Sequence, residues 1–301
     1  MVTSVVLRGV WRALLGPLPA FRTRWRAGTA GLAAVVLLTL LTQIGGVVLW
    51  LSWAGLGWMH GRLRRGTVPA PGLATAAAYA LLYAVASVAI VPPVASAFGR
   101  ERLPCFADDE LPLRAVSPLF CVSNRNYARP AVYRVLRDLS AELARVAPGT
   151  VTAYLDAGFP FLDGFPMLPH LSHRAGTDVD LAFFYRRRGD AATVRSGGAW
   201  PIGYWAYVPA RAVDPMPCAT RTLDLRWDLP WLQPAFADLA LDDRRTGTML
   251  RWLSARAGRY GIDKVLLEPH LQRRLATDPG IVRFQGCRAA RHDDHLHLQL
   301  R

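Results

Sequence analysis

Two short clusters of histidine and aspartate, far apart in the sequence, hold the residue types that bind a catalytic metal ion. The first runs from His170 to Asp180, and the second runs from His292 to His297. Five of the seven histidines fall in these clusters. A catalytic zinc ion takes three protein ligands, often imidazole and carboxylate groups, and keeps one position for water. The clusters therefore predict a zinc site, and with it a hydrolytic reaction.

The spacing within each cluster predicts a β-strand. Asp178 and Asp180 lie two residues apart in a stretch rich in β-branched and aromatic residues, so both side chains should share one face of a strand. His295 and His297 alternate with leucines, which is typical of a half-buried strand with the histidines on one face.

The two predicted strands have to be neighbours if they are to build one site. In that arrangement His173, Asp180 and His297 can converge on a single metal ion. Gly176 lies in the turn before the first strand, where we expect a positive φ or a close approach of the backbone. Calcium is a poor fit because it prefers an all-oxygen shell. Another divalent transition metal remains an alternative to zinc.

The order and spacing of these residues resemble the zinc signature of the LAS metallopeptidases, a group that shares its fold with the hedgehog signalling domain. The pattern is most similar to the penicillin-insensitive murein endopeptidases, over roughly residues 105–301. Their His-x-Ser-His-x-x-Gly-x-Asp-x-Asp block and closing His-x-x-His-x-His block are matched by His170, Ser172, His173, Gly176, Asp178 and Asp180, and by His292, His295 and His297.

The resemblance implies a role for most of these residues. The zinc ligands would be His173, Asp180 and His297. The catalytic or transition-state histidines would be His295 and His292, with His170 lining the site. The implied fold is α+β, a small antiparallel sheet with flanking helices. The implied reaction is cleavage of peptide bonds in peptidoglycan stem peptides or cross-links.

Four further acidic residues are candidates for roles in the site. Asp178, Asp293 and Asp294 are candidates for partners that orient the imidazoles, or else ordinary solvated loop residues. Glu268 is the alternative general base, although a histidine is favoured because imidazole titrates in the useful pH range.

Two other functions are compatible with the same residues. One is a D,D- or L,D-carboxypeptidase or an amidase with the same metal site. The other is a non-catalytic, zinc-containing module that binds the cell wall, since a fold of this kind can keep its zinc and lose catalysis.

Residues 1–104 have the composition of a membrane region. Uncharged apolar runs predict two transmembrane helices, at about 31–54 and 72–97, each longer than the ~20 residues that cross a bilayer. We expect Pro92 and Pro93 to kink or end the second helix. The first 100 residues contain nine arginines and no acidic residue. This charge predicts contact with membrane lipid, and no motif indicates nucleic acid as a partner.

The charge pattern conflicts with the implied substrate. Five arginines within residues 8–26 place the N-terminus in the cytoplasm, and two crossings would return the domain of residues 105–301 to that side. Peptidoglycan lies outside. The resemblance therefore favours a domain on the extracytoplasmic side of the bacterial inner (cytoplasmic) membrane.

Four cysteines, Cys105, Cys121, Cys218 and Cys287, all follow the membrane region. An even number fits two disulfides in an oxidising compartment, and four free buried thiols are the alternative.

Apolar periodicity and turn residues predict the remaining elements of the domain. They are a helix over 130–146, a strand over 151–155, a loop over 159–169 beside the metal cluster, an exposed loop over 186–200, a helix over 242–260 and a strand over 264–267.

Overall fold

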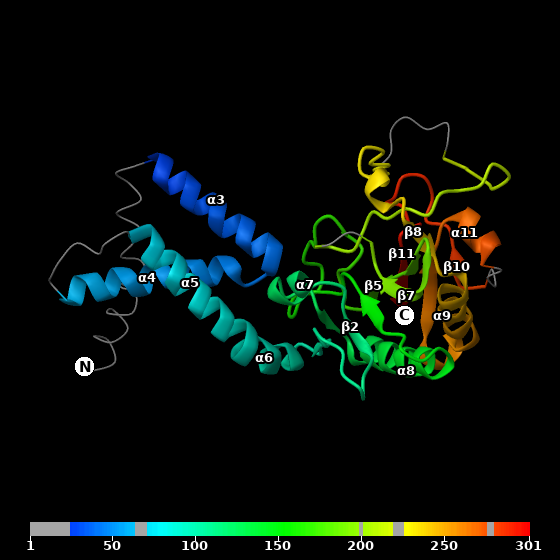
Figure 1. Cartoon of the computed structure of the whole chain (residues 1–301). Helices are drawn as coiled ribbons and strands as arrows, with labels where there is room; N and C mark the ends of the chain where they lie inside the picture. The colour runs from blue at the N-terminus through cyan, green and yellow to red at the C-terminus, as the bar shows by residue number, and fades with distance from the viewer. Residues whose placement is uncertain (1–24, 64–70, 199–200, 219–225, 276–279) are drawn as a thin grey trace. The chain divides into compact units, whose positions relative to one another are not determined.

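The computed structural model describes residues 25–63, 71–198, 201–218, 226–275 and 280–301. The chain divides into two compact units, Met1–Val94 and Ala95–Arg301 (Figure 1). Residues 95–104, which the sequence assigned to the membrane region, therefore belong to the C-terminal unit.

The first predicted membrane helix, over 31–54, is wrong as a single element. Helix α3 (Trp25–Thr42) ends before α4 (Gly45–Leu63) begins. Gln43 between them has a φ of 66°, and the hydroxyl of Thr42 accepts a hydrogen bond from the N–H of Gly45. A Cβ on Gly46 would lie only 2.0 Å from the hydroxyl oxygen of Thr39, so the turn depends on a residue without a side chain.

The second apolar helix is continuous. It comprises α5 (Pro71–Val85), a π-helical turn η1 (Ala86–Ile90) and α6 (Val91–Ala97). The prolines at 92 and 93 have no N–H to donate, and the wider π turn directly before them lets the helix run on with a local adjustment. Pro92 and Pro93 therefore do not end the helix.

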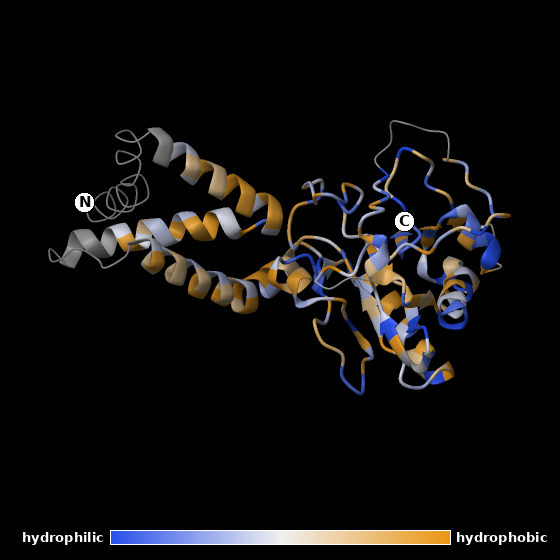
Figure 2. Cartoon of the chain, turned by 45° about the horizontal axis from the view of Figure 1, so that its top comes forward, coloured by the Kyte–Doolittle hydropathy of each residue, from blue (hydrophilic) through white to orange (hydrophobic). Residues whose placement is uncertain are grey.

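Within the described residues, Gly72–Ala97 is the one helix that is both long enough and apolar enough to cross a membrane. The apolar parts of α3 and α4, Gly28–Thr42 and Gly45–Gly57, are shorter. Figure 2 shows the apolar character of these helices. The prediction of two membrane-spanning helices is thus replaced by one long apolar helix and two short ones.

The C-terminal unit is α+β, as the sequence predicts. Its six-stranded sheet has the order β10-β9-β11-β5-β4-β2. The central strands are antiparallel, but β10 pairs with β9 and β2 with β4 in parallel, so the sheet is mixed and not purely antiparallel. The strands are β2 (Leu113–Ala115), β4 (Thr152–Tyr154), β5 (Asp178–Ala182), β9 (Ile262–Leu266), β10 (Val282–Arg283) and β11 (His295–Leu300).

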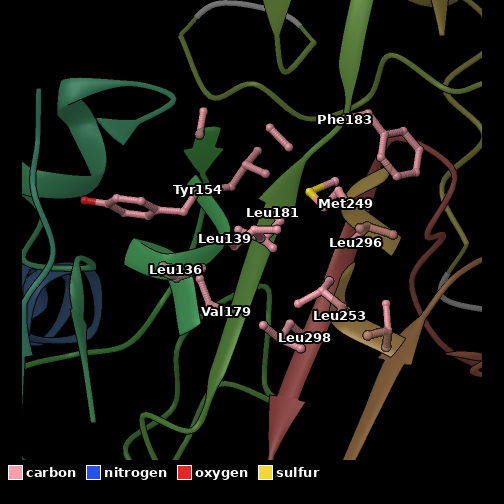
Figure 3. Close-up of a cluster of buried hydrophobic side chains, with 14 of the residues drawn as sticks. Leu136, Leu139, Tyr154, Val179, Leu181, Phe183, Met249, Leu253, Leu296 and Leu298 are labelled. Atoms are coloured by element: carbon pink, nitrogen blue, oxygen red, sulfur yellow. The ribbon is translucent and has the colours of Figure 1, made fainter. Parts of the chain in front are cut away.

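The two strands that carry the histidine and aspartate clusters are neighbours. In the antiparallel register of β5 and β11, His297 lies opposite Asp180 and His295 lies opposite Ala182. The alternate residues of both strands are apolar and face the core. Figure 3 shows Val179, Leu181, Leu296 and Leu298 against side chains of helices α8 (Pro130–Val146) and α9 (Asp243–Ala255).

The predicted exposed loop over 186–200 is wrong in part. Strands β6 (Phe184–Arg187) and β7 (Asp190–Ser196) form a hairpin, which β8 (Leu239–Leu241) extends to a three-stranded sheet. Gly189, with a φ of 85°, makes the turn between the strands. The richness in arginine suggested a loop, yet a hairpin with one solvated face accepts these residues equally well.

The other predicted elements are confirmed, with small shifts at their ends. Helix α8 matches the prediction over 130–146, and β4 and β9 match the two short strands. The predicted helix over 242–260 divides at Arg256 into α9 and α10 (Ala257–Tyr260). The remaining elements are β1 (Glu101–Arg102), α7 (Pro118–Val122), β3 (Tyr127–Ala128), η2 (Gln233–Phe236) and α11 (Pro269–Arg274).

All four cysteines form disulfides, Cys105–Cys121 and Cys218–Cys287. The second bond joins segments 69 residues apart and fastens the long segment that follows β7 to the segment before β11. The alternative of free buried thiols is therefore wrong.

Candidate metal centre

The polar faces of β5 and β11 meet at a buried cluster of carboxylate and imidazole groups. Asp178 and Asp180 come from β5, and His295 and His297 come from β11. Each of these four residues is at most 4% exposed. Charged groups are rarely buried to this degree unless they are paired or bind a metal.

Asp180 lies at the centre of this cluster. Its Oδ1 atom is 3.1 Å from His173 Nε2 and 2.9 Å from His297 Nδ1. Its Oδ2 atom accepts a hydrogen bond of 2.7 Å from the Tyr204 hydroxyl and lies 3.2 Å from His170 Nδ1. One carboxylate therefore touches histidines from both sequence clusters.

His170, His173 and Asp180 form a group that can hold a metal ion. Each offers one ligand atom, and these atoms lie within 4.8 Å of one another. His297 Nδ1 lies on the same carboxylate. The structure thus brings all three predicted zinc ligands together, with His170 nearby as a fourth candidate ligand.

Both His173 and His297 have an outer partner that fixes the ring. The Nδ1 atom of His173 lies 2.7 Å from the carbonyl oxygen of Ala157, so this nitrogen carries the hydrogen and Nε2 faces Asp180. The Nε2 atom of His297 lies 3.4 Å from Asp178 Oδ1, which leaves Nδ1 for Asp180. Such partners orient imidazoles that bind metals.

His295 has a similar arrangement without direct contact to Asp180. Its Nδ1 atom is 2.5 Å from Asp294 Oδ1, and its Nε2 atom is 3.8 Å from Asp180 Oδ2. The other oxygen of Asp294 accepts a hydrogen bond from the N–H of Trp205. Asp294 therefore holds the ring so that Nε2 faces the centre of the cluster.

The His292 ring packs against His295 and His297, with centroid distances of 5.0 and 5.9 Å. Its buried Nδ1 atom has no hydrogen-bond partner among the described residues. Most buried polar atoms are paired, so this nitrogen has unused capacity toward a bound molecule.

Glu268 and Asp293 lie behind this histidine and are held by arginines. Glu268 Oε2 is 2.9 Å from Arg226, and its Oε1 accepts a hydrogen bond from the N–H of His292. Asp293 Oδ1 accepts a hydrogen bond of 2.9 Å from Arg291. Glu268 therefore supports the backbone at His292, whereas Asp293 pairs with Arg291. Because both oxygens of Glu268 are already engaged, a histidine is the better candidate for proton transfer.

Two residues of the cluster were missed from the sequence, Tyr204 and Asp156. Asp156 lies 3.0 Å from His170 Nδ1 and pairs with Arg125 at 2.5 Å. It lies two residues after the end of β4, and an acidic residue close to the end of a buried strand is a signal that could have identified it. Tyr204 lies in an irregular segment with no periodic signal, and nothing in the sequence marks it.

The charges of the cluster shift several pKa values. Burial acts to lower the pKa of His170, but hydrogen bonds to Asp156 and Asp180 outweigh it and raise this pKa to about 10. In the same way Asp178 and Asp180 overcome burial and raise the pKa of His297 to about 9. The surrounding histidines hold the pKa of Asp180 well below its usual value, against the effect of burial.

The pKa of His292 moves the other way. Burial and the nearby His295 and His297 lower it well below the usual value, so this imidazole is neutral near pH 7. Burial and the charges of Asp180 and Asp156 raise the pKa of Tyr204 well above its usual value, so the phenol stays protonated.

The turn before β5 places the first cluster. Gly176 has a φ of 66°, and a Cβ added there would lie 1.1 Å from Nη1 of the buried Arg100. Arg100 also pairs with Asp163, in the segment 159–169. The expectation of a positive φ or a close approach at Gly176 is confirmed on both counts.

No protein-family model matches this chain, and no curated protein matches it. The geometry of the site is therefore the basis for assigning a function.

Proposed function

We propose that this protein is a membrane-anchored, zinc-dependent peptidase that cleaves peptide bonds in peptidoglycan stem peptides or cross-links. The observation that carries the proposal is the convergence of His173 Nε2 and His297 Nδ1 on one oxygen of Asp180. The order of these residues in the sequence, with its resemblance to the murein endopeptidases, gives the substrate class.

The donor set fits zinc. In a tetrahedral site with metal–ligand distances of about 2.0–2.1 Å, neighbouring ligand atoms lie about 3.3 Å apart. The two nitrogen-to-oxygen distances at Asp180 Oδ1, 2.9 and 3.1 Å, are close to that separation. Two imidazoles with one carboxylate suit zinc better than magnesium or calcium. We therefore propose His173, Asp180 and His297 as the ligands.

Around such an ion, the remaining histidines have separate tasks. Bound zinc supplies Lewis-acid activation of water and of the scissile carbonyl. His295 Nε2 is the group placed to accept a proton from water and to return it to the leaving amine, because Asp294 holds its Nδ1–H. His292 is placed to offer a hydrogen bond to the oxyanion that develops.

The N-terminal unit supports a membrane anchor. Helix Gly72–Ala97 is long enough to cross the bilayer once, whereas the 15 residues of Gly28–Thr42 reach only about 23 Å at 1.5 Å per residue. Arg62, Arg64 and Arg65 precede the long helix, which favours its N-terminal end in the cytoplasm. A single crossing then puts the C-terminal unit outside the bacterial inner membrane, where disulfides persist.

One observation favours a second candidate, a non-catalytic zinc module that binds the cell wall. The side chain of His170 is 16% exposed, whereas those of His173, Asp180, His295 and His297 are at most 5% exposed. A closed ligand set of this kind is typical of a structural zinc site. The same burial applies to a carboxypeptidase or an amidase with this metal site.

The deciding experiment is digestion of peptidoglycan sacculi by the full-length protein in detergent. Mass spectrometry of the products identifies the cleaved bond and separates endopeptidase from carboxypeptidase and amidase. We expect new peptide termini that disappear with a chelator and in Asp180→Asn, but persist in Asp214→Asn, a surface control. Binding of sacculi without any cleavage would favour the non-catalytic module.

A further inference from the structure

The two oxygens of Asp180 have different surroundings. Oδ1 faces the proposed ligand nitrogens of His173 and His297. Oδ2 faces the other way, toward Tyr204 and His170. A carboxylate in this position can bind a metal through Oδ1 while Oδ2 is occupied by hydrogen bonds.

Tyr204 makes the shortest of the contacts at Oδ2. Its hydroxyl donates to Asp180 Oδ2 at 2.7 Å and accepts from the N–H of Asp156 at 3.3 Å. The residue is 6% exposed, and its ring packs edge-on against His170 and His295 with centroid distances of 4.8 and 5.0 Å. The hydroxyl group and the ring of Tyr204 are thus both held by their neighbours. The hydroxyl can therefore donate to Asp180 Oδ2 without a further loss of side-chain freedom.

The segment that carries Tyr204 is bonded to the two residues that directly precede β11, Asp293 and Asp294. The N–H of Trp205 donates to Asp294, the partner of His295. Three residues on, the N–H of Val208 donates to the carbonyl oxygen of Asp293. Successive residues of one segment therefore hold the proposed ligand Asp180 and the proposed base His295.

We propose that Tyr204 is a positioning residue of the metal centre, which holds Asp180 Oδ2 so that Asp180 binds zinc through Oδ1 alone. This inference rests on the metal site of the proposed function but does not depend on the peptidase reaction. Outer partners of this kind typically contribute 10–100-fold to metal affinity. Without the hydroxyl, Oδ2 would lose its shortest contact and keep the longer one to His170 Nδ1 at 3.2 Å, so it would be held less firmly against turning toward the ion as a second ligand atom.

The test uses zinc and cobalt with the full-length protein in detergent. We expect Tyr204→Phe to bind zinc 10–100-fold more weakly in competition with a chromophoric chelator. We also expect the visible bands of its cobalt form to weaken, because a second carboxylate oxygen raises the coordination number above four. Tyr207→Phe is the matched control, since that hydroxyl donates to the carbonyl of Trp227. Wild-type zinc affinity and a wild-type cobalt spectrum in Tyr204→Phe would overturn the inference.

A second measurement covers the case in which Tyr204→Phe does not fold. 3-Fluorotyrosine placed at position 204 keeps the hydroxyl, and its ¹⁹F resonance should shift when zinc binds, whereas the same probe at position 207 should not respond. An unchanged resonance at 204 in zinc-loaded protein would overturn the inference. Zinc binding with these responses but without cleavage of sacculi would leave it standing and remove the peptidase proposal.

Discussion

His297 lies directly opposite Asp180 in the ladder between β5 and β11, and its Nδ1 atom is 2.9 Å from Asp180 Oδ1. The contact joins residues 117 positions apart in the sequence. Directly opposed residues on one face of an antiparallel pair have Cβ atoms about 5 Å apart, which suits two ligands of one ion.

The first prediction separates the two possible ligand sets. We expect about one zinc per chain in the wild type, and loss of most of it in His173→Ala, Asp180→Ala and His297→Ala, because each removes one of three ligands. His170→Ala should keep its zinc. Metal analysis after dialysis decides the matter. Zinc retained in His297→Ala but lost in His170→Ala would make His170 the third ligand.

The second prediction separates ligand from catalyst. His295→Ala should retain zinc but lose activity on sacculi by on the order of 10²–10⁴-fold, the usual contribution of a positioned proton-transfer group. His292→Ala should behave similarly if it binds the oxyanion. Glu268→Gln should lose much less, because Glu268 is paired with Arg226. An inactive Glu268→Gln beside active histidine variants would assign the base to Glu268.

The third prediction concerns pH and the metal-free protein. The folded pKa of His170 is about 10, above the unfolded value of about 6.5. Its stabilising contribution is therefore fully present below pH 6.5 and is lost as the pH rises toward 10. The gap in melting temperature between the chelator-treated wild type and His170→Gln should shrink over this window. A gap that widens with rising pH would contradict the raised pKa.

The fourth prediction concerns membrane orientation. Alkaline phosphatase fused after Arg301 should be active, and the same reporter fused after Arg65 should be inactive, because one crossing separates the two positions in the proposed topology. A green fluorescent reporter that folds only in the cytoplasm should give the opposite pattern. Inactive phosphatase and bright fluorescence at both positions would mean an even number of crossings between them and a domain on the cytoplasmic side.

The fifth prediction compares two glycines with positive φ. Gly189→Ala meets open space and should cost only the backbone strain, about 1–2 kcal/mol. Gly176→Ala adds a collision with the buried Arg100 and should cost more, on the order of 3 kcal/mol or above. Thermal unfolding followed by tryptophan fluorescence measures both. Equal losses would show that Arg100 moves aside freely.

Local patterns were enough to predict the strands that carry the site. Alternation placed Asp178 with Asp180 and His295 with His297 on common faces, because a strand repeats every two residues. Alternation does not say which strands are neighbours, so the convergence on one carboxylate depended on the resemblance. Tyr204 reaches the site from an irregular segment, where no periodicity exists to detect.

The errors in the membrane region have a related cause. Hydropathy measures the composition of a stretch, and 31–54 is uncharged and mostly apolar, with Thr39, Thr42, Gln43 and Ser52 as its polar residues. The backbone turn at Gln43 and the close packing at Gly46 are geometric features that a sum of hydropathies does not contain. The same limit explains the hairpin at Gly189, which an arginine-rich composition concealed.

The position of β11 between β5 and β9 has a kinetic consequence. The strand that closes the sheet also brings in His297, so a chain still lacking β11 has neither a complete sheet nor a complete set of proposed ligands. Closing a contact between residues this far apart is slow compared with forming local helices. Metal capture should therefore be a late event, and the rate at which zinc is taken up during refolding should report the docking of this one strand.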